Sequence, residues 1–155
     1  MMKQHIGLSR VYRFSAAHRL HSDKLDDQAN FEVYDKCNNI NGHGHDYTVE
    51  LTLVGIPDPE TGMIIPLEEF DQKAKAILGE LDYRHLNKEV AYFREHLSTG
   101  EIIIQYLWDR FSEAFADHIL HHLKIWETGN NYFEIHRGGE QNKRAIKKKW
   151  KMPFG

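Results

Sequence analysis

Residues 43–56 alternate between apolar and polar side chains, and two histidines stand at the start of this alternation. A period of two predicts a β-strand on which residues i and i+2 point to the same face. We therefore expect His43 and His45 to project side by side, as two ligands of one metal ion would. Gly42 and Gly44 precede and separate them, so the backbone can come close to other groups without obstruction from a Cβ atom.

A second alternating stretch, residues 6–20, predicts another strand, on which His18 shares a face with Phe14 and Ala16. If the two strands pair, His18 meets His43 and His45. Catalytic zinc takes three protein ligands and keeps a position open for water or substrate. Three imidazoles suit Zn²⁺, although nickel, cobalt and copper accept the same ligands. These histidines are therefore a predicted metal site with zinc as the expected ion.

The only cysteine, Cys37, lies six residues before His43. Two interpretations are open for it. A thiol beside an open metal site favours a catalyst, whereas a thiol that joins three imidazoles would complete the four ligands of a structural zinc site. A lone cysteine forms no disulfide within the chain, which is typical of a reducing compartment.

Further along the chain the pattern becomes helical and then returns to strands. Proline, acidic residues and an apolar face predict a helix over residues 66–81, and Ser98 with Glu101 resembles a capping box at the start of a second helix that ends near Leu120. Residues 22–42 and 82–99 are expected to be loop or turn. The last elements are predicted strands at residues 123–128 and 132–137 around a turn at 129–131.

The predicted order is ββααββ, which indicates an α+β domain: an antiparallel four-stranded sheet with two helices packed on one face. The unpaired sheet edges favour association with further copies of the chain. We assign residues 1–140 to this domain and residues 141–155 to a basic, solvated tail.

Composition sets looser limits. The formal net charge of −3 gives no overall bias toward nucleic acid or membranes, and 41% hydrophobic residues exclude disorder of the whole chain. No apolar stretch of about 18 residues and no secretory leader pattern are present, so we expect a cytoplasmic protein. Most of the 11 histidines are expected on the surface, among them His121 and His122.

Two segments, Phe-Ser-Ala-Ala-His at 14–18 and Cys-Asn-Asn-Ile-Asn-Gly-His-Gly-His-Asp-Tyr at 37–47, resemble the 6-pyruvoyl-tetrahydropterin synthase family, which includes the 6-carboxytetrahydropterin synthases of queuosine synthesis. Shorter similarities at 58–63, 81–82, 106–109 and 126–128 extend the resemblance over about residues 8–137. The spacing from Cys37 to His43 is that of the pyruvoyl branch.

The resemblance implies the tunnelling fold (T-fold), in which trimers close a barrel and stack into hexamers with sites between subunits. It implies zinc on His18, His43 and His45, and a pterin triphosphate as substrate. The other implied roles are a catalytic thiol at Cys37, a relay carboxylate at Asp82, a pterin-anchoring carboxylate at Glu127, and a pterin-lining segment that contains Thr99 and Glu101.

Two positions depart from the family pattern. Tyr83 stands where the family has its relay histidine. Two candidates remain for that role: His85, if the short turn shifts by two residues, and the phenol of Tyr83 itself. Gly100 and Ile102 stand where the family tends to have Thr and Asn.

Several functions remain open on these residues. The main prediction is a zinc-dependent lyase that converts 7,8-dihydroneopterin triphosphate to 6-pyruvoyl-tetrahydropterin. The alternatives are a 6-carboxytetrahydropterin synthase, side-chain cleavage toward folate precursors, a non-catalytic homologue that binds zinc and pterin, and a structural zinc domain.

Overall fold

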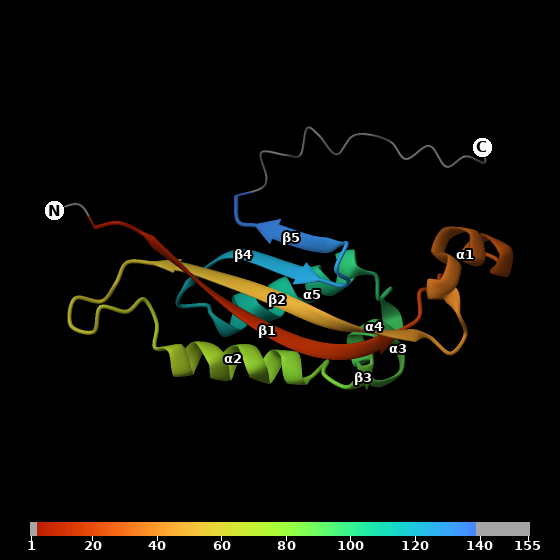
Figure 1. Ribbon diagram of the computed structural model, residues 1–155, viewed down its shortest axis with the longest axis horizontal. Helices are drawn as coiled ribbons and strands as arrows, with labels where there is room; N and C mark the ends of the chain where they lie inside the picture. Colours follow the sequence, from red (N-terminus) through yellow and green to blue (C-terminus); the bar gives the residue numbers. More distant parts are fainter. Residues whose placement is uncertain (1–2, 139–155) are drawn as a thin grey trace.

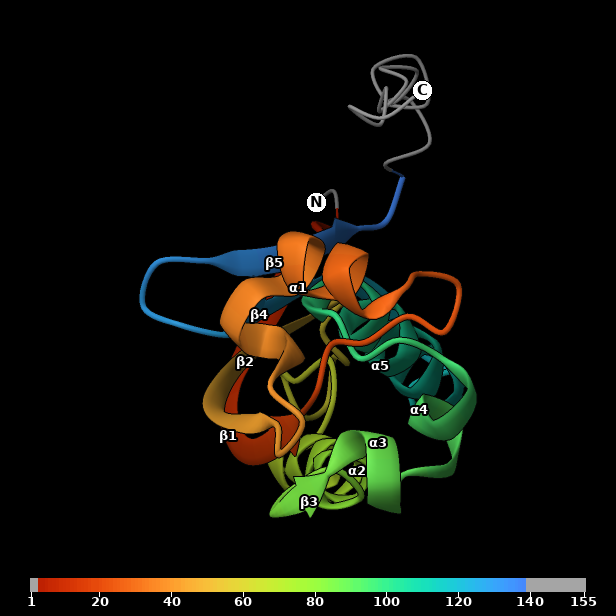
Figure 2. The same ribbon diagram turned by 90° about the vertical axis from the view of Figure 1, so that its right-hand side faces the viewer.

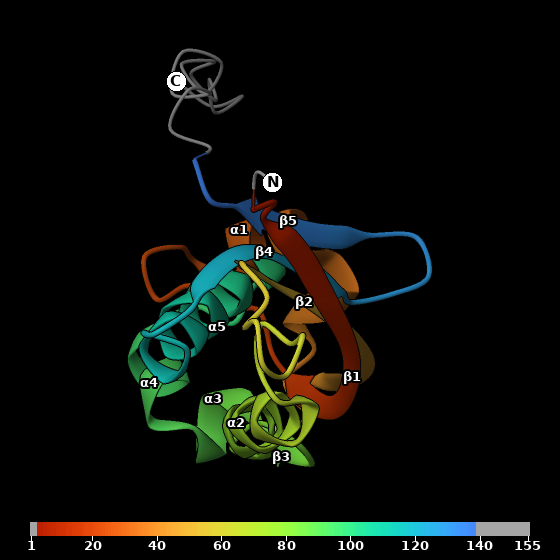
Figure 3. The ribbon, with the colours of Figure 1, turned by 90° about the vertical axis from the view of Figure 1, so that its left-hand side faces the viewer.

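The computed structural model describes residues 3–138, and the predicted basic tail, 141–155, lies outside this range. The chain forms an α+β fold in which one curved sheet wraps around two long helices (Figures 1 and 3). The sheet has the strand order β3-β1-β2-β4-β5. Its strands are β1 (Ile6–His18), β2 (His43–Gly55), β3 (Arg84–His85), β4 (Ile119–Trp126) and β5 (Tyr132–His136).

The helices divide into two long ones and several short ones. The long helices, α2 (Leu67–Gly79) and α5 (Gly100–Ala114), lie on the inner face of the sheet (Figure 3). The short elements are α1 (Asp27–Tyr34), the 3₁₀ helix η1 (Asp35–Asn38), α3 (Leu86–Glu89) and α4 (Ala91–Glu95).

The core forms between the inner face of the sheet and these helices. Alternate residues of β1, β2 and β4 point inward, and the inward residues of α2 and α5 meet them at helical spacing. Val49, Leu51, Phe70, Leu107 and Phe111 are fully buried there. The two amphipathic helices and the alternating strands were predicted from these periods, but the second helix was predicted too long: α5 ends at Ala114 and β4 already begins at Ile119.

The predicted count and order of elements were incomplete. A fifth strand, β3, joins the sheet edge and runs parallel to β1, so the sheet is mixed and not purely antiparallel. Residues 22–42 are not a plain loop, because α1 and η1 form within them; Asp26 caps α1 by accepting a hydrogen bond from the Ala29 amide. The 82–99 segment likewise holds β3, α3 and α4.

The first strands pair in an antiparallel ladder that extends through the whole of β1 and β2, with His18 opposite His43. Beyond these strand ends, α1 projects past one end of the sheet, as Figure 2 shows from that side. The connection from β1 to β2 therefore crosses the end of the sheet where the predicted metal ligands lie.

No helix within residues 3–138 is both long and apolar enough to cross a bilayer.

Candidate functional site

Three histidines meet on the inner face of the sheet, at the open end of the β1–β2 ladder. His18 is the register partner of His43, and His45 faces Ala16, so the two-residue spacing places all three rings on one side. Their ring centroids lie 4.7 to 5.1 Å apart and their planes cross at 76° to 81°. The ligand nitrogens of the three residues lie within 4.8 Å of one another, which is the predicted convergence.

The free nitrogens of this cluster point at one another and not at the rest of the chain. His18 holds its Nδ1 at 2.7 Å from the carbonyl oxygen of Ser98, which accepts the proton and leaves the lone pair on Nε2. That Nε2 lies 3.1 Å from Nε2 of His43. Nε2 of His45 is buried and has no hydrogen-bond partner in the described part of the chain, residues 3–138. A shared cation would satisfy all three atoms, so the residues fit a metal ion.

Burial favours the neutral form of His18 and His45, which is the form that binds metals. Loss of solvent lowers the pKa of His18 to about 4, and the neighbouring imidazoles add to this effect. Burial likewise lowers the pKa of His45. Both rings therefore offer an unprotonated nitrogen at neutral pH.

Cys37 lies in η1, beside the end of β1. The Leu20 amide donates to the carbonyl of Cys37 at 2.8 Å, and the Asn38 side chain donates to the carbonyl of Leu20 at 2.7 Å. Within residues 3–138, the group of potential ligands at this centre contains the three histidines and not Cys37. The thiol is therefore free, which argues against the four-ligand structural site.

Glu127 occupies the adjoining end of β4, half-buried and next in register beyond the pair formed by Thr48 and Trp126. Its charge reaches the thiol: burial raises the pKa of Cys37, and the charges of Glu127 and Asp35 raise it further. Within the described residues, its carboxylate accepts a single side-chain hydrogen bond, a long one of 3.4 Å from Asn131. Most of its acceptor capacity is therefore free for a ligand.

The predicted relay residues lie on the other side of β1. Asp82 accepts a hydrogen bond from the Ser15 amide at 2.8 Å, and the Tyr83 amide donates to the Ser15 carbonyl. Tyr83 has a φ of 57°, in the left-handed region that is uncommon for a bulky residue, and 86% of it is exposed. Its ring therefore lies at the surface of the chain.

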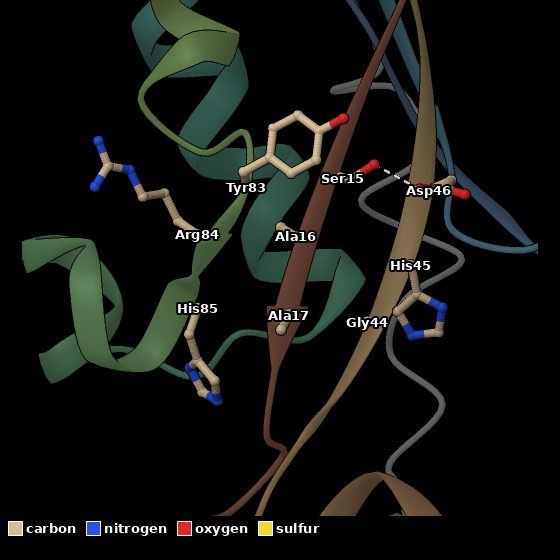
Figure 4. A pocket seen from close by; sticks show the side chains of 9 residues that line it. All are labelled: Ser15, Ala16, Ala17, Gly44, His45, Asp46, Tyr83, Arg84 and His85. Atoms are coloured by element: carbon tan, nitrogen blue, oxygen red, sulfur yellow. Dashed lines mark hydrogen bonds between the residues drawn. The ribbon is translucent and has the colours of Figure 1, made fainter.

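His85 pairs with Ala17 through β3 and packs against the backbone at Gly42. Both of its ring nitrogens are buried and have no hydrogen-bond partner among residues 3–138, and burial lowers its pKa. Figure 4 shows its ring on the β3 side of β1, whereas the His45 ring lies beyond β2. Within residues 3–138 no hydrogen bond joins His85 to Cys37 or Asp82, so one chain does not assemble the predicted relay.

Thr99 and Glu101 flank the first residue of α5. The predicted capping box is wrong, because Thr99 is the N-cap residue and makes no side-chain cap. Ser98 is buried, and its hydroxyl donates toward Asn87 and the Arg19 carbonyl while its own carbonyl holds His18. Sequence reasoning missed Ser98 as the residue that orients a metal ligand, because only the fold brings it to β1.

The space around Gly100, at the start of α5, explains why a glycine fits there. A Cβ atom on Gly100 would lie 2.0 Å from Cε2 of Phe133 on β5. The aromatic ring therefore fills the space that a larger side chain at position 100 would need.

Comparison with known proteins places these features in a family. The family described as 6-pyruvoyl tetrahydropterin synthase matches residues 7–138. The chain belongs to this family. A 6-pyruvoyl tetrahydrobiopterin synthase of Poecilia reticulata is 42% identical over 132 residues, which cover 84% of this chain and 89% of that protein. The human protein of the same name is 41% identical over 125 residues, covering 80% of this chain and 86% of that one.

A solved structure of the Caenorhabditis elegans 6-pyruvoyl tetrahydropterin synthase superposes with a TM-score of 0.81 at 36% identity, and the match covers 88% of this chain and 99% of that one. A protein of Wolinella succinogenes at 14% identity, with a TM-score of 0.64, shares the fold. The predicted family is confirmed by these similarities.

Proposed function

We propose that this protein is a zinc-dependent lyase that converts 7,8-dihydroneopterin triphosphate to 6-pyruvoyl-tetrahydropterin with loss of triphosphate. The observation that carries the proposal is the three-histidine centre with a free thiol beside it, in a chain of the 6-pyruvoyl tetrahydropterin synthase family. The family's reaction needs both groups, and the cytoplasm is the reducing compartment in which such a thiol persists.

His18, His43 and His45 would hold Zn²⁺ and leave a coordination position open. When bound, the ion would polarise the side-chain hydroxyls of the substrate and acidify the adjacent carbon-bound protons. The Ser98 carbonyl would keep His18 in the tautomer that this binding requires.

Glu127 would anchor the pterin ring. Its carboxylate has room for two parallel N–H···O bonds, the pattern that the guanidine-like edge of a pterin offers. Thr99 and Glu101, at the start of α5, would line the same pocket, since the neighbouring Ser98 touches His18.

Cys37 would remove and return protons at the side-chain carbons of the substrate. The negative charge of Glu127 helps to raise the pKa of this thiol. A pterin that pairs with Glu127 would offset that charge and favour the thiolate. Binding of substrate and activation of the base would thus be coupled.

Asp82 and either His85 or Tyr83 would complete the proton relay, and a second copy of the chain would supply them. Tyr83 is exposed, and the edge strand β5 pairs only with β4 within residues 3–138. Both observations support a homo-oligomer, a trimer or hexamer, with its sites between subunits.

A non-catalytic homologue that binds zinc and pterin is the second candidate. Tyr83 favours it, because histidine is the side chain suited to proton transfer near neutral pH and a phenol is a poor substitute for it.

One experiment separates these functions. Zinc-loaded protein and its Cys37→Ala variant are incubated with 7,8-dihydroneopterin triphosphate, and the products are resolved by mass spectrometry. A 6-pyruvoyl product from the parent alone, with equal zinc in both proteins, supports the proposal. A 6-carboxy product assigns the chain to the other branch, and unchanged substrate that binds in a Glu127-dependent manner supports the non-catalytic homologue.

A further inference from the structure

A second group of metal-ligating side chains lies on the outer face of the sheet, away from α2 and α5. His122 on β4 and His136 on β5 are cross-strand partners. Glu134 precedes His136 by two residues and so projects from the same face. The β2–β4 register shifts at His121, so that His122 lies opposite Thr52 on this face.

The ligand atoms of this outer cluster are already close together. Oε2 of Glu134 lies 3.0 Å from Nε2 of His122 and 3.3 Å from Nε2 of His136. All three atoms lie within 4.8 Å of one another. Ligand atoms that surround a tetrahedral ion at about 2.0–2.2 Å stand roughly 3.4 Å apart, which is close to these separations.

The carboxylate of Glu134 turns toward the histidines and not toward the nearest lysine. Lys124 is its direct cross-strand partner. The ammonium of Lys124 instead lies 3.9 Å from the ring centroid of Tyr132 and 4.7 Å from that of Trp126. Among residues 3–138, the ion pairs of Glu134 are with the two histidines, so its negative charge is available to a cation at this place.

We propose that His122, Glu134 and His136 form a second binding site for a divalent transition-metal ion, which joins β4 to the edge strand β5. Two imidazoles and one carboxylate form a ligand set that zinc, cobalt, nickel and iron(II) accept. The remaining positions of the ion face solvent, since His136 is 53% and Glu134 39% exposed.

Binding requires a small rearrangement of the rings. The two imidazoles now stack, with centroids 4.0 Å apart and an interplanar angle of 13°, so their lone pairs run parallel. To bind one ion in the planes of both rings, the two imidazoles must rotate so that their Nε2 lone pairs converge. His136 has room to rotate because half of its side chain is exposed, whereas His122, at 15%, is held against the sheet.

The site would stabilise the hairpin that carries Glu127 at its turn. β5 has its described strand contacts only with β4, and its other face packs against α5 through Phe133 and Gly100. An ion across β4 and β5 would therefore hold the edge strand against this helix. The proposal uses residues of a single chain and does not depend on the proposed enzymatic function.

The test counts metal ions per chain. Protein stripped with a chelator is titrated with Co²⁺, whose visible absorption reports each coordination environment, and with Zn²⁺ against a colorimetric chelator. The parent chain is expected to bind two equivalents. Glu134→Gln and His136→Ala are each expected to bind one, and His18→Ala is expected to keep only the outer site.

His121→Ala is the matched control, because His121 neighbours His122 in the chain yet lies outside the cluster. It is expected to bind two equivalents, and Zn²⁺ should raise the melting temperature of His18→Ala but not that of the His18→Ala/His136→Ala double variant. A parent chain that binds one equivalent, or a His136→Ala variant that still binds two, would overturn the proposal.

Discussion

The contact between Gly100 and Phe133 leads to a quantitative prediction. In Gly100→Ala the new Cβ atom would lie 2.0 Å from Cε2, 2.4 Å from Cζ and 2.6 Å from Cδ2 of the Phe133 ring. These separations are far below van der Waals contact, so β5 must move or the ring must leave its rotamer. Overpacking of this kind costs typically about 1–3 kcal/mol.

The helix propensity of alanine acts in the opposite direction. Gly→Ala gains up to about 1 kcal/mol inside a helix, and less at its first residue, where Gly100 lies. The net expected destabilisation is therefore about 1–2 kcal/mol. For a chain of this size, that corresponds to a fall in melting temperature of roughly 2–8 °C.

Urea denaturation and calorimetry of a double-mutant cycle measure this energy. Phe133→Val removes the clashing ring atoms, so Gly100→Ala/Phe133→Val should be more stable than the sum of the single variants predicts, by about 1 kcal/mol or more. Gly79→Ala is the control, because Gly79 ends α2 with open space around its missing Cβ, and this variant should be at least as stable as the parent. A Gly100→Ala variant of parental stability, or independent single effects, would refute the reasoning.

Two further predictions concern charge. Glu127→Gln should lower the pKa of the Cys37 thiol, because one of the charges that raise it is removed, so alkylation by iodoacetamide should become rapid at a lower pH than in the parent. Glu101→Gln is the control and should leave the pH dependence of alkylation unchanged. An unchanged pH dependence in Glu127→Gln would contradict the effect assigned to the Glu127 charge. In the metal-free protein the pKa of His18 is about 4 in the folded state and near 6.5 in the unfolded state. The unfolded state therefore binds more protons between these two pH values. The free energy of unfolding should fall as the pH falls through this window, by up to roughly 3 kcal/mol. Denaturation curves at pH 7 and pH 4.5 should show this loss in the parent and a smaller one in His18→Gln; equal losses in both would assign the effect to other groups.

The convergence of the three histidines could be predicted from the sequence because it depends on strand periodicity. His43 and His45 need only a period of two to share a face, and pairing with the neighbouring alternating stretch then adds His18. The helical faces of α2 and α5 were predictable for a similar reason, since their apolar spacing is local.

Features that depend on tertiary contacts could not be predicted in this way. Ser98 resembled a helix cap, but in the folded chain its carbonyl bonds to His18 and its hydroxyl bonds to Asn87. β3 has two residues, too few for any periodic pattern to be recognised. His122 was expected to face solvent, whereas its side chain is 15% exposed, because the register shift at His121 and the pairing with β5 decide its environment.

The three-histidine site exists only when β1 and β2 pair in their native register. A slip of one residue would place His18 opposite Gly44 and turn one strand's inward side chains outward, which would separate the imidazoles and expose the core together. An ion that needs all three rings therefore binds only the chain whose strands are aligned as they are here. A metal ion bound by all three rings would therefore stabilise the native register over a slipped one during folding.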